Sequence, residues 1–157
     1  MKLYTSLIIT FIFFSFSLIS IEANAQVTNP KYDKALADSM GADAYGMKMY
    51  VLVILKTGEA KLDKSKQDSL FMGHLNNIVR LAGIGKLVVS GPIVKNEKQY
   101  RGIFILNVKT LDEAKTLLET DPAISNHLLD TEMFQWYGSA ALPIYLPYHD
   151  SVKMKDF

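Results

Sequence analysis

His74 is the residue of this chain that is best placed, by type and spacing, to transfer a proton. In residues 71–82 a helical turn of about 100° per residue gathers the apolar side chains in one sector. These are Phe71, Leu75, Ile78, Leu81 and Ala82. His74 lies inside the sector, one turn before Ile78, whereas Asn76 and Arg80 lie on the opposite, solvated side. A half-buried imidazole needs a partner for each ring nitrogen.

Asp121 is the carboxylate that we expect to partner His74. A carboxylate bonded to one imidazole nitrogen fixes the tautomer, stabilises the imidazolium and leaves the other nitrogen free to move a proton. Ser90, Gly91 and Pro92 are expected to bind the ligand, because the Ser90 hydroxyl and the amides near Gly91 can orient a carbonyl or carboxylate. No glycine-flanked nucleophile is present, which disfavours covalent hydrolase chemistry.

Each of these residues also has a structural interpretation. A lone histidine on an apolar helix face is often a core residue whose polar atoms are satisfied. Asp121, which precedes Pro122, can simply cap a short turn through Ser125. Ser90-Gly91-Pro92 can be no more than the end of a strand. The hypothesis of a functional site therefore depends on the fold bringing the three together.

The order of predicted elements is strand, helix, strand, strand, helix, strand. Apolar runs predict strands at 49–55, 87–90, 102–108 and 128–137. A helix over 64–82 begins after Asp63 as N-cap and ends before Gly83. A second helix begins with a capping box between Thr110 and Glu113 and ends near Thr120. This order predicts an α+β, ferredoxin-like βαββαβ domain with a four-stranded antiparallel sheet.

That topology brings the candidate residues to one rim of the sheet. The first helix begins, the second strand ends and the second helix ends on the same side, so His74, Ser90 and Asp121 converge. The first and third strands carry large apolar side chains on both faces, so the face without helices also needs a cover. A second copy of the sheet is the simplest one, and we expect a homodimer with a barrel-like α+β core.

The remaining segments and the composition predict where the protein is located and exclude some classes of function. Residues 1–25 have the positive start, apolar run and small-x-small end of a secretory signal, which predicts export to the periplasm or medium and no membrane anchor after cleavage. Residues 26–46 form a lead-in with a short helix that Asn29-Pro30 starts and Gly41 ends, residues 47–137 form the domain, and residues 138–157 form an aromatic, proline-bearing tail. The net charge of +1 offers no basic field for nucleic acid, and the absence of cysteine excludes thiol chemistry.

The motif order resembles the YCII-related family. The resemblance spans about Tyr45 to Tyr137 and is carried by the runs His74-Leu75, Gly85-Lys86-Leu87 before Ser90-Gly91-Pro92, Gly102-Ile103-Phe104-Ile105 and Asp121-Pro122. It implies a dimeric α+β barrel related to muconolactone isomerase-like proteins, with His74 and Asp121 as the pair; a few members resemble lyases that eliminate a small leaving group. His127 departs from the small residue that relatives tend to carry after the Asp-Pro turn.

Two functions remain open from the sequence. The first is proton-transfer chemistry, elimination or isomerisation, on a small carbonyl compound or aromatic acid, with His74 as base and Asp121 as its orienting partner. The second is a non-catalytic module that holds a small ligand or partner in the same cleft or on the aromatic tail near Trp136. A third hypothesis, haem or metal binding through His74, His127 or His149, has less support, because the spacing of these histidines gives no ligand motif. We expect no cofactor.

Overall fold

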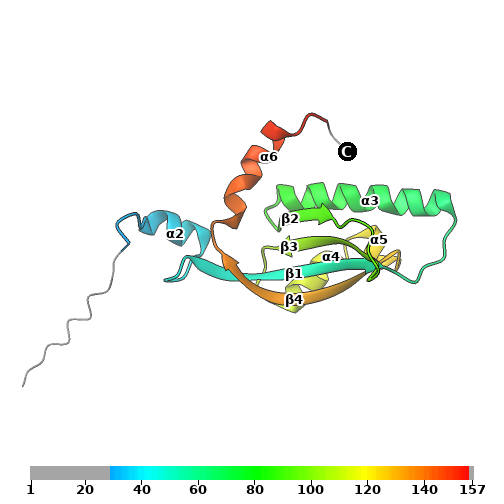
Figure 1. Ribbon diagram of the computed structural model, residues 1–157, viewed down its shortest axis with the longest axis horizontal. Coiled ribbons are helices and arrows are strands. Elements are labelled where there is room, and N and C mark those ends of the chain that lie inside the picture. The colour runs from blue at the N-terminus through cyan, green and yellow to red at the C-terminus, as the bar shows by residue number, and fades with distance from the viewer. Residues whose placement is uncertain (1–28, 156–157) are drawn as a thin grey trace, which may run out of the picture. The chain divides into compact units, whose positions relative to one another are not determined.

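A computed structural model describes residues 29–155, which form the predicted ferredoxin-like α+β domain with flanking helices (Figure 1). The elements are α2 (Lys34–Met40), β1 (Met47–Thr57), α3 (Lys64–Gly83), β2 (Leu87–Pro92), β3 (Tyr100–Leu106), α4 (Leu111–Leu118), α5 (Pro122–Ser125), β4 (Leu129–Ser139), η2 (Leu142–Tyr145) and α6 (Leu146–Val152). The four strands are ordered β2-β3-β1-β4, and every neighbouring pair is antiparallel. The predicted βαββαβ order is therefore confirmed.

One face of the sheet forms the core with the helices. Alternate residues of β1 and β3 are buried there, because side chains of a strand point to opposite faces in turn. They pack with Leu81 of α3 and with Ala114 and Leu118 of α4. The capping box predicted at Thr110 and Glu113 starts α4, and Asp63 caps α3 through the amide of Lys66.

The other face of the sheet is apolar but only partly covered. Register pairs Leu52 of β1 with Ile105 of β3 and Phe134 of β4, so these three side chains share that face. Phe134 is 49 % exposed. A cluster of this kind is expected to be covered in the functional state.

Two local predictions were wrong. The second strand does not end at Ser90 but continues through Gly91 and Pro92, since these pair with Ile103 and Gly102. Proline is tolerated there because β2 lies at the edge of the sheet and Pro92 is its last residue.

The lead-in helix begins later than expected. Asp33, not Asn29-Pro30, caps α2 by accepting the amide of Leu36, whereas Asn29 and Lys31 form a separate turn. Gly41 ends α2 in the left-handed conformation, as predicted. The predicted signal over residues 1–25 lies outside the described residues.

The chain after the domain continues as structured elements. β4 extends to Ser139, and the backbone amide of Ala140 donates to the carbonyl of Gly46. Tyr145 of η2 donates its hydroxyl to the carbonyl of Val88 in β2, which holds the C-terminal segment beside the edge strand. Within residues 29–155, no helix is both long and apolar enough to cross a membrane.

Candidate functional site

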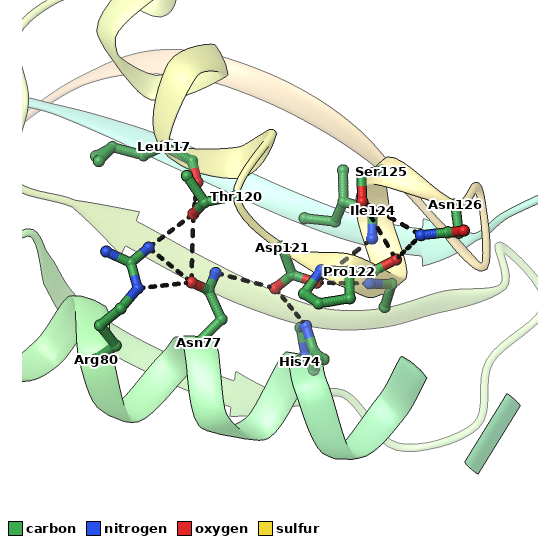
Figure 2. Close-up of polar contacts among 11 residues, drawn as sticks. His74, Asn77, Arg80, Leu117, Thr120, Asp121, Pro122, Ile124, Ser125 and Asn126 are labelled. Carbon is green, nitrogen blue, oxygen red and sulfur yellow. Dashed lines mark hydrogen bonds and ion pairs between the residues drawn. The ribbon is translucent and has the colours of Figure 1, made fainter. Parts of the chain in front are cut away.

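The side chains of His74 and Asp121 form a buried hydrogen-bonded pair between α3 and the N-terminus of α5 (Figure 2). The Nδ1 atom of His74 lies 2.7 Å from Oδ2 of Asp121, although the two residues are 47 positions apart in the sequence. His74 is 5 % exposed and Asp121 is fully buried. The rim predicted from topology therefore exists in the structure.

The two carboxylate oxygens of Asp121 have separate partners. Oδ1 accepts the backbone amides of Ala123 at 2.9 Å and Ile124 at 3.4 Å, which caps the short helix α5. Oδ2 accepts from His74 and, at 3.4 Å, from Nδ2 of Asn77. Asp121 thus both caps α5 and binds His74, two roles that the sequence offered as alternatives. The cap orients the carboxylate so that one oxygen faces the imidazole.

Asn77 extends the pair into a polar network that the sequence did not predict. Its side-chain oxygen accepts from Nη2 of Arg80 at 2.7 Å and from Oγ1 of Thr120 at 3.2 Å, and Arg80 Nη2 also donates to Thr120 at 2.7 Å (Figure 2). Arg80 is exposed, as expected, yet its guanidinium reaches back over the helix. These bonds orient the Asn77 amide so that its NH₂ faces Asp121. The only sequence signal was that Asn77 follows His74 by three residues, on the same helical face.

The surroundings keep Asp121 ionised. Burial acts to raise the pKa of this carboxyl, but the hydrogen bond and the charge of His74, with the amides of Ala123 and Asn77, outweigh it and hold the pKa below its ordinary value. A carboxylate accepts but does not donate, so the proton of the shared hydrogen bond belongs to Nδ1 of His74. In the neutral imidazole, Nε2 is then the unprotonated, basic nitrogen.

Two aromatic rings flank the imidazole. The ring centroids of Phe71 and Phe104 each lie 5.7 Å from that of His74, with planes inclined by 32° and 21°. Phe71 comes from α3 and Phe104 from β3, so helix and sheet hold the imidazole from both sides. Together with the bond to Asp121, these contacts restrict the ring to one orientation.

His74 opens onto a large cavity between α3 and the ends of β1, β2 and β3. The cavity has a volume of about 980 Å³ and a mostly apolar lining. His74, Ser90, Gly91 and Pro92 all line it, whereas Asp121 lies behind the imidazole and does not. Among the described residues, Nε2 of His74 has no hydrogen-bond partner. Every fully buried side-chain nitrogen and oxygen in that part of the chain does have a partner, so Nε2 is not fully buried. Nε2 therefore keeps contact with solvent, and the cavity is where it can meet a ligand.

The comparison with family models agrees with this architecture. The model described as the YCII-related domain matches residues 49–137, more than half of the chain. The chain belongs to the YCII-related family. This YCII-related domain contains α3, the cavity-lining strands and Asp121, so the candidate site lies entirely within the matched region.

One solved structure is similar to this YCII-related protein at low identity. It is 5-chloro-2-hydroxyhydroquinone dehydrochlorinase from Burkholderia phenoliruptrix AC1100, in complex with 2,5-dihydroxybenzoquinone. The two share 18 % identity with a TM-score of 0.42, and the match covers 55 % of this chain and 92 % of the other. No curated protein matches this chain.

The other histidines of the YCII-related protein lie away from the site. His127 is exposed, adopts a positive φ of 55° and does not line the cavity, although Leu128 and Leu129 do. His149 lies on α6. In the part of the chain that the structure describes, no three side chains of His, Cys, Asp or Glu come together as a metal site. His74 is therefore the histidine that a ligand in the cavity would meet.

Proposed function

We propose that this protein catalyses proton transfer on a small organic molecule, an elimination or an isomerisation, with His74 as the base. The observation that carries the proposal is that the two nitrogens of one imidazole have different surroundings. Nδ1 is bound to a buried carboxylate, whereas Nε2 has no partner among residues 29–155 and belongs to a side chain that lines a cavity. A base of this kind contributes about 10²- to 10⁴-fold to a rate. Asp121 does not reach the cavity and acts by positioning His74.

The proposed reaction begins at a carbon next to a carbonyl group of the ligand. Nε2 of His74 takes a proton from that carbon, and the C–H electron pair moves toward the carbonyl oxygen. The imidazolium that forms is stabilised by the ionised Asp121. In an isomerisation, the same proton returns to another carbon; in an elimination, the electron pair expels a leaving group as an anion and His74 later loses the proton to water. We expect the hydroxyl of Ser90, which lines the cavity beside Gly91, to donate to the carbonyl oxygen.

Hydrogen–deuterium exchange into candidate ligands tests the proton abstraction without knowledge of the natural substrate. Small lactones, 2-oxo acids and cyclic enones are incubated in D₂O with the protein, and loss of the C–H signal beside the carbonyl is followed by proton NMR. We expect exchange with the wild-type protein on at least one compound class and none with His74→Gln. His149→Gln, an exposed histidine on α6, is the matched control and should exchange like the wild type.

Binding without exchange would contradict the catalytic proposal. If compounds bind in the cavity and shift its amide signals, but no C–H exchange or product appears on any class, the protein is a binding module. Equal exchange by the wild type and His74→Gln would show that His74 is not the base.

We also propose that the protein is a homodimer in which two sheets pack through the half-exposed apolar face that carries Leu52, Ile105 and Phe134. This face is only partly covered by the described residues, and a stable cover of this size buries roughly 800 Å² on each partner. Sedimentation equilibrium tests it. Phe134→Asp should yield a folded monomer, whereas Val79→Asp, on the exposed side of α3, should leave the dimer intact. A wild-type monomer at all concentrations would contradict the proposal.

Export is proposed from the sequence alone. Expression of the full chain in a bacterial host, followed by mass spectrometry of the periplasmic fraction, should find a protein that begins at Gln26. An intact N-terminus in the cytoplasm would contradict it.

A further inference from the structure

We infer that Arg101 and Lys95 form an anion-binding wall in the cavity, so the ligand is an apolar organic acid. This inference rests on the proposed function, because it describes the ligand on which His74 would act. It concerns the β2–β3 side of the cavity, away from Asp121 and its network. Arg101 lies in β3, and Lys95 lies in the loop that joins β2 to β3.

The first observation is a break in the register of the sheet at Arg101. Leu55 of β1 pairs with Gly102, but the next residue, Lys56, pairs with Tyr100, so Arg101 is the extra residue of a bulge. In a regular strand, Arg101 would share a face with Ile103, on the side without helices. Instead it lines the cavity beside Gly102 and Phe104. A bulge that re-aims one side chain is a recurring feature beside binding sites.

The second observation is the balance of charge in the cavity lining. Three lining residues are charged: Asp68, Lys95 and Arg101. Asp68 is already paired with Lys64 at 2.8 Å, one turn earlier in α3. Within residues 29–155, neither Lys95 nor Arg101 has an ion pair, and neither side chain donates a hydrogen bond to the protein. Two uncompensated cations beside a mostly apolar surface attract and orient an anion.

The two features define the shape of the ligand. Its apolar part would lie against Phe104, Ile78 and Leu55, which line the same cavity. Its anionic group would bind the guanidinium of Arg101, whose planar fork matches the two oxygens of a carboxylate. The charge would thereby fix which carbon of the ligand faces Nε2 of His74, as an anchor away from the reacting atoms does in enzymes generally.

Two probes of nearly the same shape separate the contribution of the charge to binding from that of the apolar contact. The probes are 2-naphthoate and its neutral analogue 2-naphthamide, titrated into the ¹⁵N-labelled protein while the amide signals of Gly91 and Gly102 are followed. We expect 2-naphthoate to bind at least about tenfold more tightly, a difference that corresponds to about 1.4 kcal/mol. Its affinity should fall with added salt, whereas that of 2-naphthamide should not.

Arg101→Gln should abolish this preference by weakening 2-naphthoate alone, and Lys95→Gln should reduce it. Lys115→Gln, an exposed cation of α4 that does not line the cavity, is the matched control and should keep the preference of the wild type. Equal binding of the two probes by the wild type would overturn the inference. So would a loss in Arg101→Gln that affects both probes alike, since that loss would reflect packing.

The outcome is distinguishable from failure of the proposed function. If exchange depends on His74 but no preference for the anion exists, only the anion-binding wall is refuted. If the preference depends on Arg101 but no compound exchanges, only the catalytic proposal is refuted.

Discussion

Gly73 and Pro122 lie in direct contact, and this contact sets how closely α3 approaches α5. A Cβ atom added to Gly73 would lie 2.9 Å from Cγ and 3.3 Å from Cβ of Pro122. Gly73 precedes His74 and Pro122 follows Asp121, so the contact lies beside the hydrogen-bonded pair on both elements. The absence of a side chain at position 73 is therefore a condition for the 2.7 Å bond between His74 and Asp121.

Gly73→Ala should lengthen the hydrogen bond between His74 and Asp121. Alanine favours a helix over glycine by about 1 kcal/mol, but overpacking against a proline ring costs about 1 to 3 kcal/mol, so we expect a net destabilisation of about 1 kcal/mol. Urea denaturation measures it. The proton NMR signal of the Nδ1–H of His74, downfield in the wild type, should weaken or move upfield as the bond lengthens.

Gly83→Ala is the matched control for that prediction. Gly83 is the last residue of the same helix, and an added Cβ would meet no atom within 4 Å. It should leave stability equal or higher and the His74 signal unchanged. If both variants behave alike, the contact with Pro122 does not constrain the pair.

Asp121→Asn should invert the tautomer of His74 while keeping the helix cap. The side-chain oxygen of the asparagine would still accept the amides of Ala123 and Ile124, so its NH₂ group would face His74. An NH₂ group donates, and Nδ1 would then have to accept, which places the proton on Nε2 and removes the base from the cavity. We expect exchange activity to fall by about 10² to 10⁴ with little change in ligand affinity.

The tautomer itself is the decisive readout. Long-range ¹H–¹⁵N correlation spectra distinguish protonated Nδ1 from protonated Nε2 in the neutral ring. Asp130→Asn, an exposed aspartate in β4, should retain both the wild-type tautomer and its activity. Loss of activity with an unchanged tautomer would show that Asp121 acts in another way.

The sequence predicted the fold because its signals are local and agree with one another. The run from Met49 to Leu55, the cap at Asp63 and the box at Thr110 each specify one element, and the order of the elements leaves few topologies. The meeting of His74 and Asp121 followed from that topology alone. It needed only the side of the sheet on which each helix begins and ends, which does not depend on side-chain conformation.

The parts that the sequence did not predict depend on side-chain reach and register. Arg80 was expected on a solvated face, and nothing in its spacing indicates that it reaches back to Asn77 and to Thr120, 40 residues later. The bulge at Arg101 changes the face of one residue without disturbing the apolar pattern around it. The alternation of apolar and polar residues in a strand does not indicate where one extra residue forms a bulge.

The pKa of Asp121 predicts a specific loss of stability in acid. Because the pKa of its carboxyl lies below the ordinary value of 3.8, the folded state binds this proton less readily than the unfolded state. The stabilisation is therefore complete above that ordinary value and disappears as the pH falls through the lower folded-state pKa. Urea midpoints from about pH 7 to about pH 2.5 should decline less steeply in Asp121→Asn than in the wild type.

Other carboxylates also contribute to the loss of stability at low pH. The test therefore uses the difference between the urea midpoints of the wild type and Asp121→Asn at each pH. The pKa of Glu113 is lowered by its bonds to Thr110, and that of Asp43 by its bond to Tyr137. Both groups remain in Asp121→Asn and cancel when the two curves are subtracted. Parallel curves for the two proteins over the whole range would contradict a stabilising ionised Asp121.

Gly58 is the position where an added methyl group should be most damaging. A Cβ there would lie 2.1 Å from the carbonyl oxygen of His127, a backbone atom that also accepts the amide of Ala60. The backbone of the loop after α5 would have to move, and with it Leu128 and Leu129, which line the cavity. We expect Gly58→Ala to cost roughly 3 kcal/mol or more.

The same loop stores strain that another substitution should release. His127 has a φ of 55°, a left-handed conformation that costs a residue with a Cβ about 1 to 2 kcal/mol. His127→Gly should therefore offset part of the loss when combined with Gly58→Ala, because a glycine lets the loop shift without that cost. Denaturation of the two single variants and the double variant measures the coupling. Strictly additive effects would mean that the contact between Gly58 and His127 does not govern this turn, and that the strain at His127 is held elsewhere.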